Sequence, residues 1–220
     1  TLRFTATDAE GKLTEDALLD ARVCDCCQTS AALTTDGLVV AYRDRSGKEI
    51  RDISVVRFSR GRWTEPRPLS VDDWEIHGCP VNGPPVSADG RRVAVAWFTA
   101  AKDTPIVKVI FSGDSGATFG QAIRVDDGTP VGRVDVLMLS DGSALVCWLE
   151  RTAKGGEIKL RRVRPEGSLD SSLTVAESGV ARASGFPQIA RSGNNVVVAW
   201  TEPGAQSRIR TASVRIGSTK

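Results

Sequence analysis

The sequence predicts an all-β protein, and three observations support this. Short runs of apolar and β-branched residues alternate with turn-forming residues along the whole chain. Glycine and proline are frequent, with 21 and 10 copies, and no segment keeps the periodicity of a long helix. The third observation is a short segment that recurs along the chain. With 220 residues, 40% of them apolar, the chain can bury a core as one domain.

The recurring segment consists of a turn dipeptide, an apolar β-branched run and a closing aromatic residue. The closing residues are Tyr42, Trp97, Trp148 and Trp200, at intervals of 55, 51 and 52 residues. A period of about 50 residues is what a four-stranded blade of a β-propeller requires. We therefore expect antiparallel four-stranded blades, with the three tryptophans at equivalent places near the ends of second strands.

The repeats divide the chain into about four blades and a half-blade. Residues 1–23 are predicted to supply two outer strands, at 1–7 and 17–23, joined by a turn at 8–13. Blades follow at 24–75, 76–128 and 129–181, and 182–220 form an incomplete blade. Either the two ends complete one another in a small ring, or the chain is part of a larger propeller. A half-blade at the start favours the second alternative.

Within each blade, the apolar run before the closing aromatic is the second strand, and its neighbours follow from the turn residues. The first blade is expected to have strands at 29–35, 38–43, 50–58 and 67–71, and the second at 86–88, 93–98, 106–111 and 122–125. The third is expected at 135–139, 144–149, 158–163 and 173–176, and the last at 187–190, 196–200 and 208–214. In such a meander, the linkers between blades and the loops after second strands lie at one end.

The segment 112–119, which reads SGDSGATF, resembles the Asp-box, or BNR repeat, of sialidases, S-x-D-x-G-x-T-[FW]. The matching residues are Ser112, Asp114, Gly116, Thr118 and Phe119. The carboxylate can accept bonds from nearby backbone N–H groups, the glycine supplies a backbone state closed to other residues, and the aromatic ring packs beneath the turn. The resemblance implies a sialidase-like β-propeller. In that family the box is structural, joins the two outer strands of a blade, and faces away from the functional funnel.

Four of the five cysteines and the only histidine lie on two neighbouring linkers. They are Cys24, Cys26, Cys27, His77 and Cys79. The favoured alternative is a disulfide from Cys79 to the cluster, which would stabilise an exported protein by about 2 to 4 kcal/mol. The second alternative is a thiolate-rich site for copper or zinc, and the third is free thiols. Cys147 stands in an apolar run and is expected to be a small buried hydrophobe.

The same loops and linkers also carry charged and polar residues. They are Arg43, Asp44, Arg45, Asn82, Arg133, Asp135, Glu150, Arg151, Arg182 and Glu202. A ring of arginines with a few carboxylates suits an anionic ligand such as a carboxylate sugar. The alternative is an ordinary solvated loop surface.

The sialidase resemblance implies an active site with three arginines that bind the substrate carboxylate, a tyrosine nucleophile with a glutamate partner, and an aspartate that acts as the acid. This chain has one tyrosine, Tyr42, in an early repeat, whereas the nucleophile of the family comes late. No catalytic residue can be carried over by position. We therefore expect a binding or accessory protein with a ligand or metal site at a cysteine-lined funnel. The alternative is a glycoside hydrolase that uses Asp44 together with Asp135 or Glu150.

The charge and the hydropathy of the chain indicate which classes of partner to expect. The net charge is +2 without a basic block, which gives no indication of nucleic-acid binding, and no apolar run is long enough to span a membrane. The expected partners are an anionic carbohydrate or other small ligand, and the remainder of the propeller or a second chain. The first residue is Thr1, which predicts a processed or trimmed start, and the cysteines predict a periplasmic or secreted location.

Overall fold

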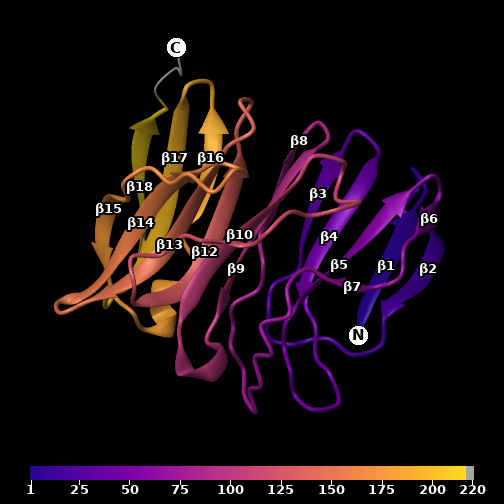
Figure 1. The fold of residues 1–220 in the computed structure, drawn as a ribbon, viewed down its shortest axis with the longest axis horizontal. Helices are drawn as coiled ribbons and strands as arrows, with labels where there is room; N and C mark the ends of the chain where they lie inside the picture. The colour runs from indigo at the N-terminus through magenta and orange to yellow at the C-terminus, as the bar shows by residue number, and fades with distance from the viewer. Residues whose placement is uncertain (217–220) are drawn as a thin grey trace.

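The computed structural model describes residues 1–216 and has an all-β fold. Within this range the helical elements are two short 3₁₀ turns, η1 (Ala101–Asp103) and η2 (Arg182–Ser184). The strands form five antiparallel sheets that follow one another along the chain. Figure 1 shows the sheets side by side, from the half-blade near the N-terminus to the last sheet near the C-terminus. The prediction of propeller blades with an additional half-blade is confirmed.

Each sheet is formed by strands that are consecutive in sequence. The half-blade contains β1 (Leu2–Thr7) and β2 (Leu13–Asp20). The first blade contains β3 (Ser30–Thr34), β4 (Gly37–Arg43) and β5 (Ile53–Ser59), with an outer edge of β6 (Arg62–Trp63) and β7 (Arg67–Pro68). The second contains β8 (Val86–Asp89), β9 (Arg92–Thr99), β10 (Ile106–Ser112) and β11 (Ile123–Arg124). The third contains β12 (Pro130–Met138), β13 (Ala144–Thr152), β14 (Gly155–Val163) and β15 (Leu173–Ser178), and the last β16 (Gln188–Ser192), β17 (Asn195–Glu202) and β18 (Arg208–Arg215).

Several strand boundaries differ from the prediction, among them the starts of β2, β5 and β12. Strand β2 begins at Leu13 because the preceding turn is tight, with the backbone N–H of Lys12 donating to the Asp8 carboxylate. Strand β12 already begins at Pro130, because register shifts on either side of Gly132 let the strand bend and continue. Strand β5 begins at Ile53, so residues 50–52 belong to the loop before it.

Apolar side chains pack between consecutive sheets, which is how propeller blades share their cores. Tyr42 belongs to the cluster that joins the half-blade to the first blade, and Trp97 to the cluster between the first and second blades. Trp148 lies between the second and third blades, and Trp200 between the third and the last. Each closing aromatic residue therefore faces the preceding sheet from a second strand. The predicted equivalence of the three tryptophans is confirmed.

The segment that resembles an Asp-box lies between β10 and β11, as expected. The Asp114 carboxylate accepts hydrogen bonds from the Thr118 backbone N–H at 2.8 Å, the Thr118 hydroxyl at 2.7 Å and the Ser112 hydroxyl at 2.7 Å. Partial burial would raise the pKa of Asp114, but these hydrogen bonds outweigh it and hold the pKa at about 2. Gly116 has a φ of +75°, where a Cβ atom would also lie 2.9 Å from Val39. The turn thus holds the second blade against the first.

The blades carry different loops at their two ends. At one end, which we call the Asp-box end, Asp114 shares a hollow with Asp36 of the β3–β4 turn. At the other, the linker end, Cys79 shares a hollow with Arg45 of the β4–β5 loop. Because these two loops leave opposite ends of β4, Asp114 and Cys79 lie at opposite ends of the blades, as the strand count predicts.

Candidate functional site

Three cysteine side chains converge at the linker end. The segment 24–27 forms a turn after β2, so Cys24, Cys26 and Cys27 do not alternate as they would on an extended strand. Their sulfur atoms all lie within 4.8 Å of one another. The Sγ atom of Cys24 is 2.9 Å from that of Cys27 and 3.5 Å from that of Cys26. We refer to these three residues as the thiol cluster.

Two buried arginines lie against the thiol cluster. Arg43, 2% exposed, donates hydrogen bonds to the backbone carbonyls of Asn82, Arg51 and Phe98, and its guanidinium lies 4.9 Å from the ring centroid of Trp74. Arg51, 6% exposed, has its Nη1 atom 3.4 Å from the Sγ atom of Cys24. Its Nε atom is buried and has no hydrogen-bond partner among the residues described. The cluster therefore lies in a positively charged environment.

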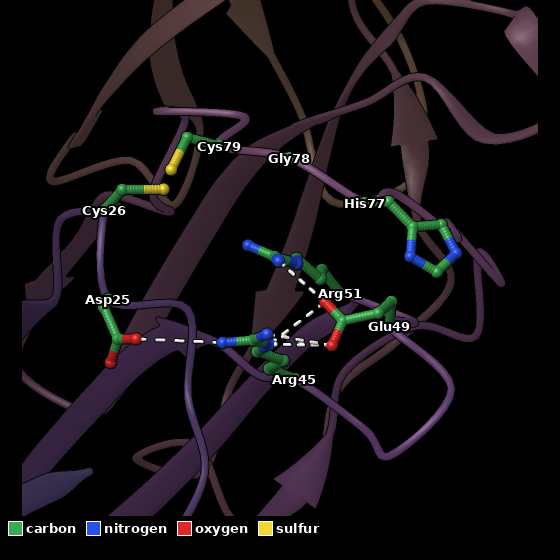
Figure 2. A pocket seen from close by; sticks show the side chains of 8 residues that line it. All are labelled: Asp25, Cys26, Arg45, Glu49, Arg51, His77, Gly78 and Cys79. Atoms are coloured by element: carbon green, nitrogen blue, oxygen red, sulfur yellow. Dashed lines mark hydrogen bonds and ion pairs between the residues drawn. The ribbon is translucent and has the colours of Figure 1, made fainter.

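A hollow of about 530 Å³ opens beside the cluster. Its lining residues are Asp25, Cys26, Arg45, Glu49, Arg51, His77, Gly78 and Cys79. Glu49 accepts hydrogen bonds from Arg45 and Arg51, and these hold its pKa at about 2. Figure 2 shows Cys26 and Cys79 on one side of this hollow and His77 on the other. Ligands could therefore reach the cluster through Cys26, which is half-buried.

The favoured disulfide between Cys79 and the cluster is not found. All five cysteines, which all fall within the described range, are free. Cys79 is exposed and lies outside the group of converging sulfurs. His77 is also outside this group. Its Nε2 atom lies 3.2 Å from the Glu75 carboxylate. Cys147 is fully buried between the third and last blades, as expected.

The donor set of the thiol cluster fits a soft metal ion. Thiolates are the ligands that Cu(I) and Zn(II) favour, and three sulfurs facing one point can bind one ion. Burial, together with the hydrogen bond to Cys24, raises the pKa of Cys27 to about 12, against the lowering effect of Arg43. In the absence of metal this thiol is therefore protonated at neutral pH, and a metal has to displace its proton in order to bind.

The remaining predicted ligand-binding residues do not form one ring. Asn82 and Arg133 line a second hollow of about 250 Å³ with Arg182 and Phe186. The guanidinium of Arg133 is already hydrogen-bonded to the carbonyls of Gly185 and Val180, which places it in a structural role. Arg43 is likewise buried, whereas Arg151 and Glu202 are exposed. Of this set, Arg45 and Arg182 are left as accessible cations beside the two hollows.

Asp135 and Glu150, the two partners offered for Asp44 in the hydrolase alternative, are held by different neighbours. Asp135 accepts a hydrogen bond from the backbone N–H of Ile189 in the last blade. Glu150 accepts bonds from Thr129 in the linker before β12 and from the indole N–H of Trp148, which faces the second blade. The two carboxylates thus lie on opposite faces of the third blade. Asp44, in the first blade, is half-buried, and burial raises its pKa. The pairing of Asp44 with Asp135 or with Glu150 across one pocket stays a prediction.

Arg51 and Glu49 were not among the predicted site residues. The prediction places Arg51 in the third strand of the first blade, because it begins that strand at Ile50. Residues 44–52 form the loop that leads from β4 to β5, and loops after second strands lie at the linker end. The strand start at Ile53 puts Arg51 in this loop with Glu49, which already precedes the predicted strand. The alternation of arginine and carboxylate in this loop was the available signal.

Comparisons with known proteins bear on the fold. No protein-family model and no curated protein matches the chain. The phage phi92 endosialidase has a TM-score of 0.62, with 9% identity over 87% of this chain and 36% of its own. A GH43_12 protein retrieved from a capybara gut metagenome has a TM-score of 0.58, with 10% identity over 87% of this chain and 40% of its own. A Trypanosoma rangeli sialidase, solved with the inhibitor DANA, has a TM-score of 0.52, with 10% identity over 97% of this chain and 40% of its own. The chain is thus similar in fold to propeller proteins of the sialidase and GH43 types, and it spans less than half the length of these three.

Proposed function

We propose that this propeller acts as a binding or accessory protein that holds a soft metal ion, copper or zinc, at its linker end. The observation that carries the proposal is the convergence of the sulfur atoms of Cys24, Cys26 and Cys27 within 4.8 Å. Harder cations such as Mg²⁺ and Ca²⁺ favour oxygen ligands, and no carboxylate oxygen of the described residues belongs to this group.

An exported location is part of this proposal. In an oxidising compartment, thiols as close as those of Cys24 and Cys27, 2.9 Å apart, would form a disulfide unless a bound metal held them as thiolates. A metal would therefore account for the convergence of the sulfurs and would protect them from oxidation.

The test is to measure the metal content of protein purified anaerobically without chelators, by inductively coupled plasma mass spectrometry. The expected result is about one copper or zinc ion per chain, lost in Cys26→Ser. Cys147→Ala is the matched control, because Cys147 is buried in the core away from the cluster. The proposal fails if the wild-type chain retains no metal after copper or zinc is supplied, or if Cys26→Ser retains as much as the wild type.

A second candidate function is the binding of an anionic carbohydrate at the same end. The observation that favours it is the hollow between the linkers, which the exposed Arg182 lines together with Phe186. Two of the structures similar in fold are sialidases, and the rest of a propeller would come from another segment or a second chain. Calorimetric titration with sialic acid tests this. Binding should be lost in Arg182→Ala and kept in Arg151→Ala; equal heats in the two variants, or none in the wild type, would exclude it.

A further inference from the structure

The charge around the thiol cluster carries an inference about the metal that the site selects, and it rests on the proposed function. Arg43 is buried, and within the described range its guanidinium makes hydrogen bonds only to backbone carbonyls. A buried charge without a partner of opposite sign is costly. The thiol cluster is close to Arg43 in the fold, since the backbone N–H of Cys24 donates to the Arg43 carbonyl oxygen at 2.9 Å. An anionic cluster would thus provide the partner that Arg43 lacks.

Arg51 contributes a second positive charge and a direct contact. Its Nη1 atom lies 3.4 Å from the Sγ atom of Cys24, within the range for a hydrogen bond to sulfur, and its Nη2 atom is 2.7 Å from the Glu49 carboxylate. Glu49 in turn is held by Arg45. Donors of this kind orient a metal-bound sulfur and stabilise its negative charge. Arg51 is therefore a positioning residue for Cys24.

The number of donors distinguishes the candidate metals. Structural zinc almost always takes four ligands, whereas this site brings three together, and Cys79 and His77 lie outside the group. Each thiol loses one proton to solvent when its sulfur binds the metal. Three thiolates with Cu(I) then give a complex of charge −2, and the same ligands with Zn(II) give −1. Arg51 shares Glu49 with Arg45, and the hydrogen bonds of Arg43 within the described range go to carbonyl oxygens, so this arrangement suits the more negative complex better.

We infer that the thiol cluster is a three-coordinate Cu(I) site whose charge is balanced by Arg43 and Arg51. Copper is bound as Cu(I), so no oxidation or reduction accompanies uptake. The geometry also assigns the hollow beside Cys26 as the entry for the ion, since Cys26 lines this hollow whereas Cys24 is buried.

The experiment compares the affinity of the metal-free, reduced chain for Cu(I) and for Zn(II), using a chromophoric chelator of each ion as competitor. Arg51→Met removes the contact to Cys24, and we expect roughly a tenfold loss or more of Cu(I) affinity. Arg45→Met is the matched control, because Arg45 lines the same hollow and bonds to Glu49 without contacting a sulfur atom. Arg51→Lys, which keeps the charge and a donor, should recover part of the loss. Circular dichroism of each variant shows whether it is folded.

The outcomes separate the inference from the function on which it rests. If neither ion binds, the metal-binding function itself fails. If Zn(II) binds with a fourth ligand and competes successfully with Cu(I), the function stands and the copper assignment is overturned. If folded Arg51→Met and Arg45→Met lose the same affinity, Arg51 acts only through general charge and its positioning role is wrong.

Discussion

The backbone N–H of Cys24 donates a hydrogen bond of 2.9 Å to the carbonyl oxygen of Arg43. Cys24 opens the thiol cluster, and Arg43 is the last residue of β4. This bond ties the linker to the end of a second strand, so the regular register of the blade determines where the sulfurs lie. It also brings the thiol cluster close to Arg43, whose guanidinium bonds only to backbone carbonyls within the described range. The proposed metal site is thus a consequence of blade geometry together with three cysteines in one turn.

The first prediction concerns the turn that resembles an Asp-box. Asp114→Ala removes the acceptor of the hydrogen bonds from Thr118 and Ser112. We expect the free energy of unfolding to fall by about 1 to 3 kcal/mol, measured by urea denaturation. Glu65→Ala is the control, since Glu65 is exposed, and it should change stability by less than about 0.5 kcal/mol. Equal stability of the two variants would show that the turn is not a stabilising element.

The second prediction concerns pH. The folded chain holds the pKa of Asp114 at about 2, below its ordinary value of 3.8. The carboxylate therefore contributes its full stability above pH 3.8 and loses it as the pH falls toward 2. The stability difference between the wild type and Asp114→Asn should shrink over this range, measured by denaturation at each pH. A difference that stays constant down to pH 2 would contradict the lowered pKa.

The third prediction concerns Glu150, which is 4% exposed and accepts hydrogen bonds from Trp148 and Thr129. Glu150→Ala leaves a buried indole N–H without a partner, so we expect a loss of roughly 2 to 4 kcal/mol in thermal or urea unfolding. Glu177→Ala, at an exposed position of the same blade, is the control. If both variants have wild-type stability, Glu150 has no structural role and its assignment as a functional carboxylate regains support.

The fourth prediction concerns the thiols of the metal-free, reduced protein. Cys79 is exposed and should react first with iodoacetamide, followed by Cys26, which is half-buried. Burial raises the pKa of Cys147, which should react only on unfolding. Peptide mass spectrometry over time gives the order. Early modification of Cys147 would indicate that the core between the third and last blades opens readily.

Most of the fold could be predicted because a repeat shows the same local pattern several times. The closing aromatics Trp97, Trp148 and Trp200 mark second strands, and the segment around Asp114 marks a turn between outer strands. Boundaries were less predictable where backbone geometry departs from a regular strand. Arg133 has a φ of +54° within β12, and such a bulge has no clear sequence signal.

The candidate site could be predicted only in part. Strand counting places the linkers and their cysteines at one end, but it does not specify which side chains converge. The sulfurs of the thiol cluster meet because the linker turns at Asp25, and Cys79 stays outside because its own linker holds it at the rim of the hollow. Asp135 and Glu150 fall on opposite faces of one sheet because Asp135 pairs with Cys147, three residues before Glu150 in β13, and side chains alternate along a strand. The convergence of the sulfurs, in contrast, is a tertiary effect.

The most direct test of the central claim is X-ray absorption spectroscopy of the chain loaded with Cu(I) and freed of excess metal. A metal bound by Cys24, Cys26 and Cys27 predicts three sulfur neighbours and no nitrogen neighbour around one copper ion per chain, with the signal lost in Cys26→Ser. A spectrum dominated by nitrogen or oxygen neighbours, or a chain that retains no copper, would contradict it.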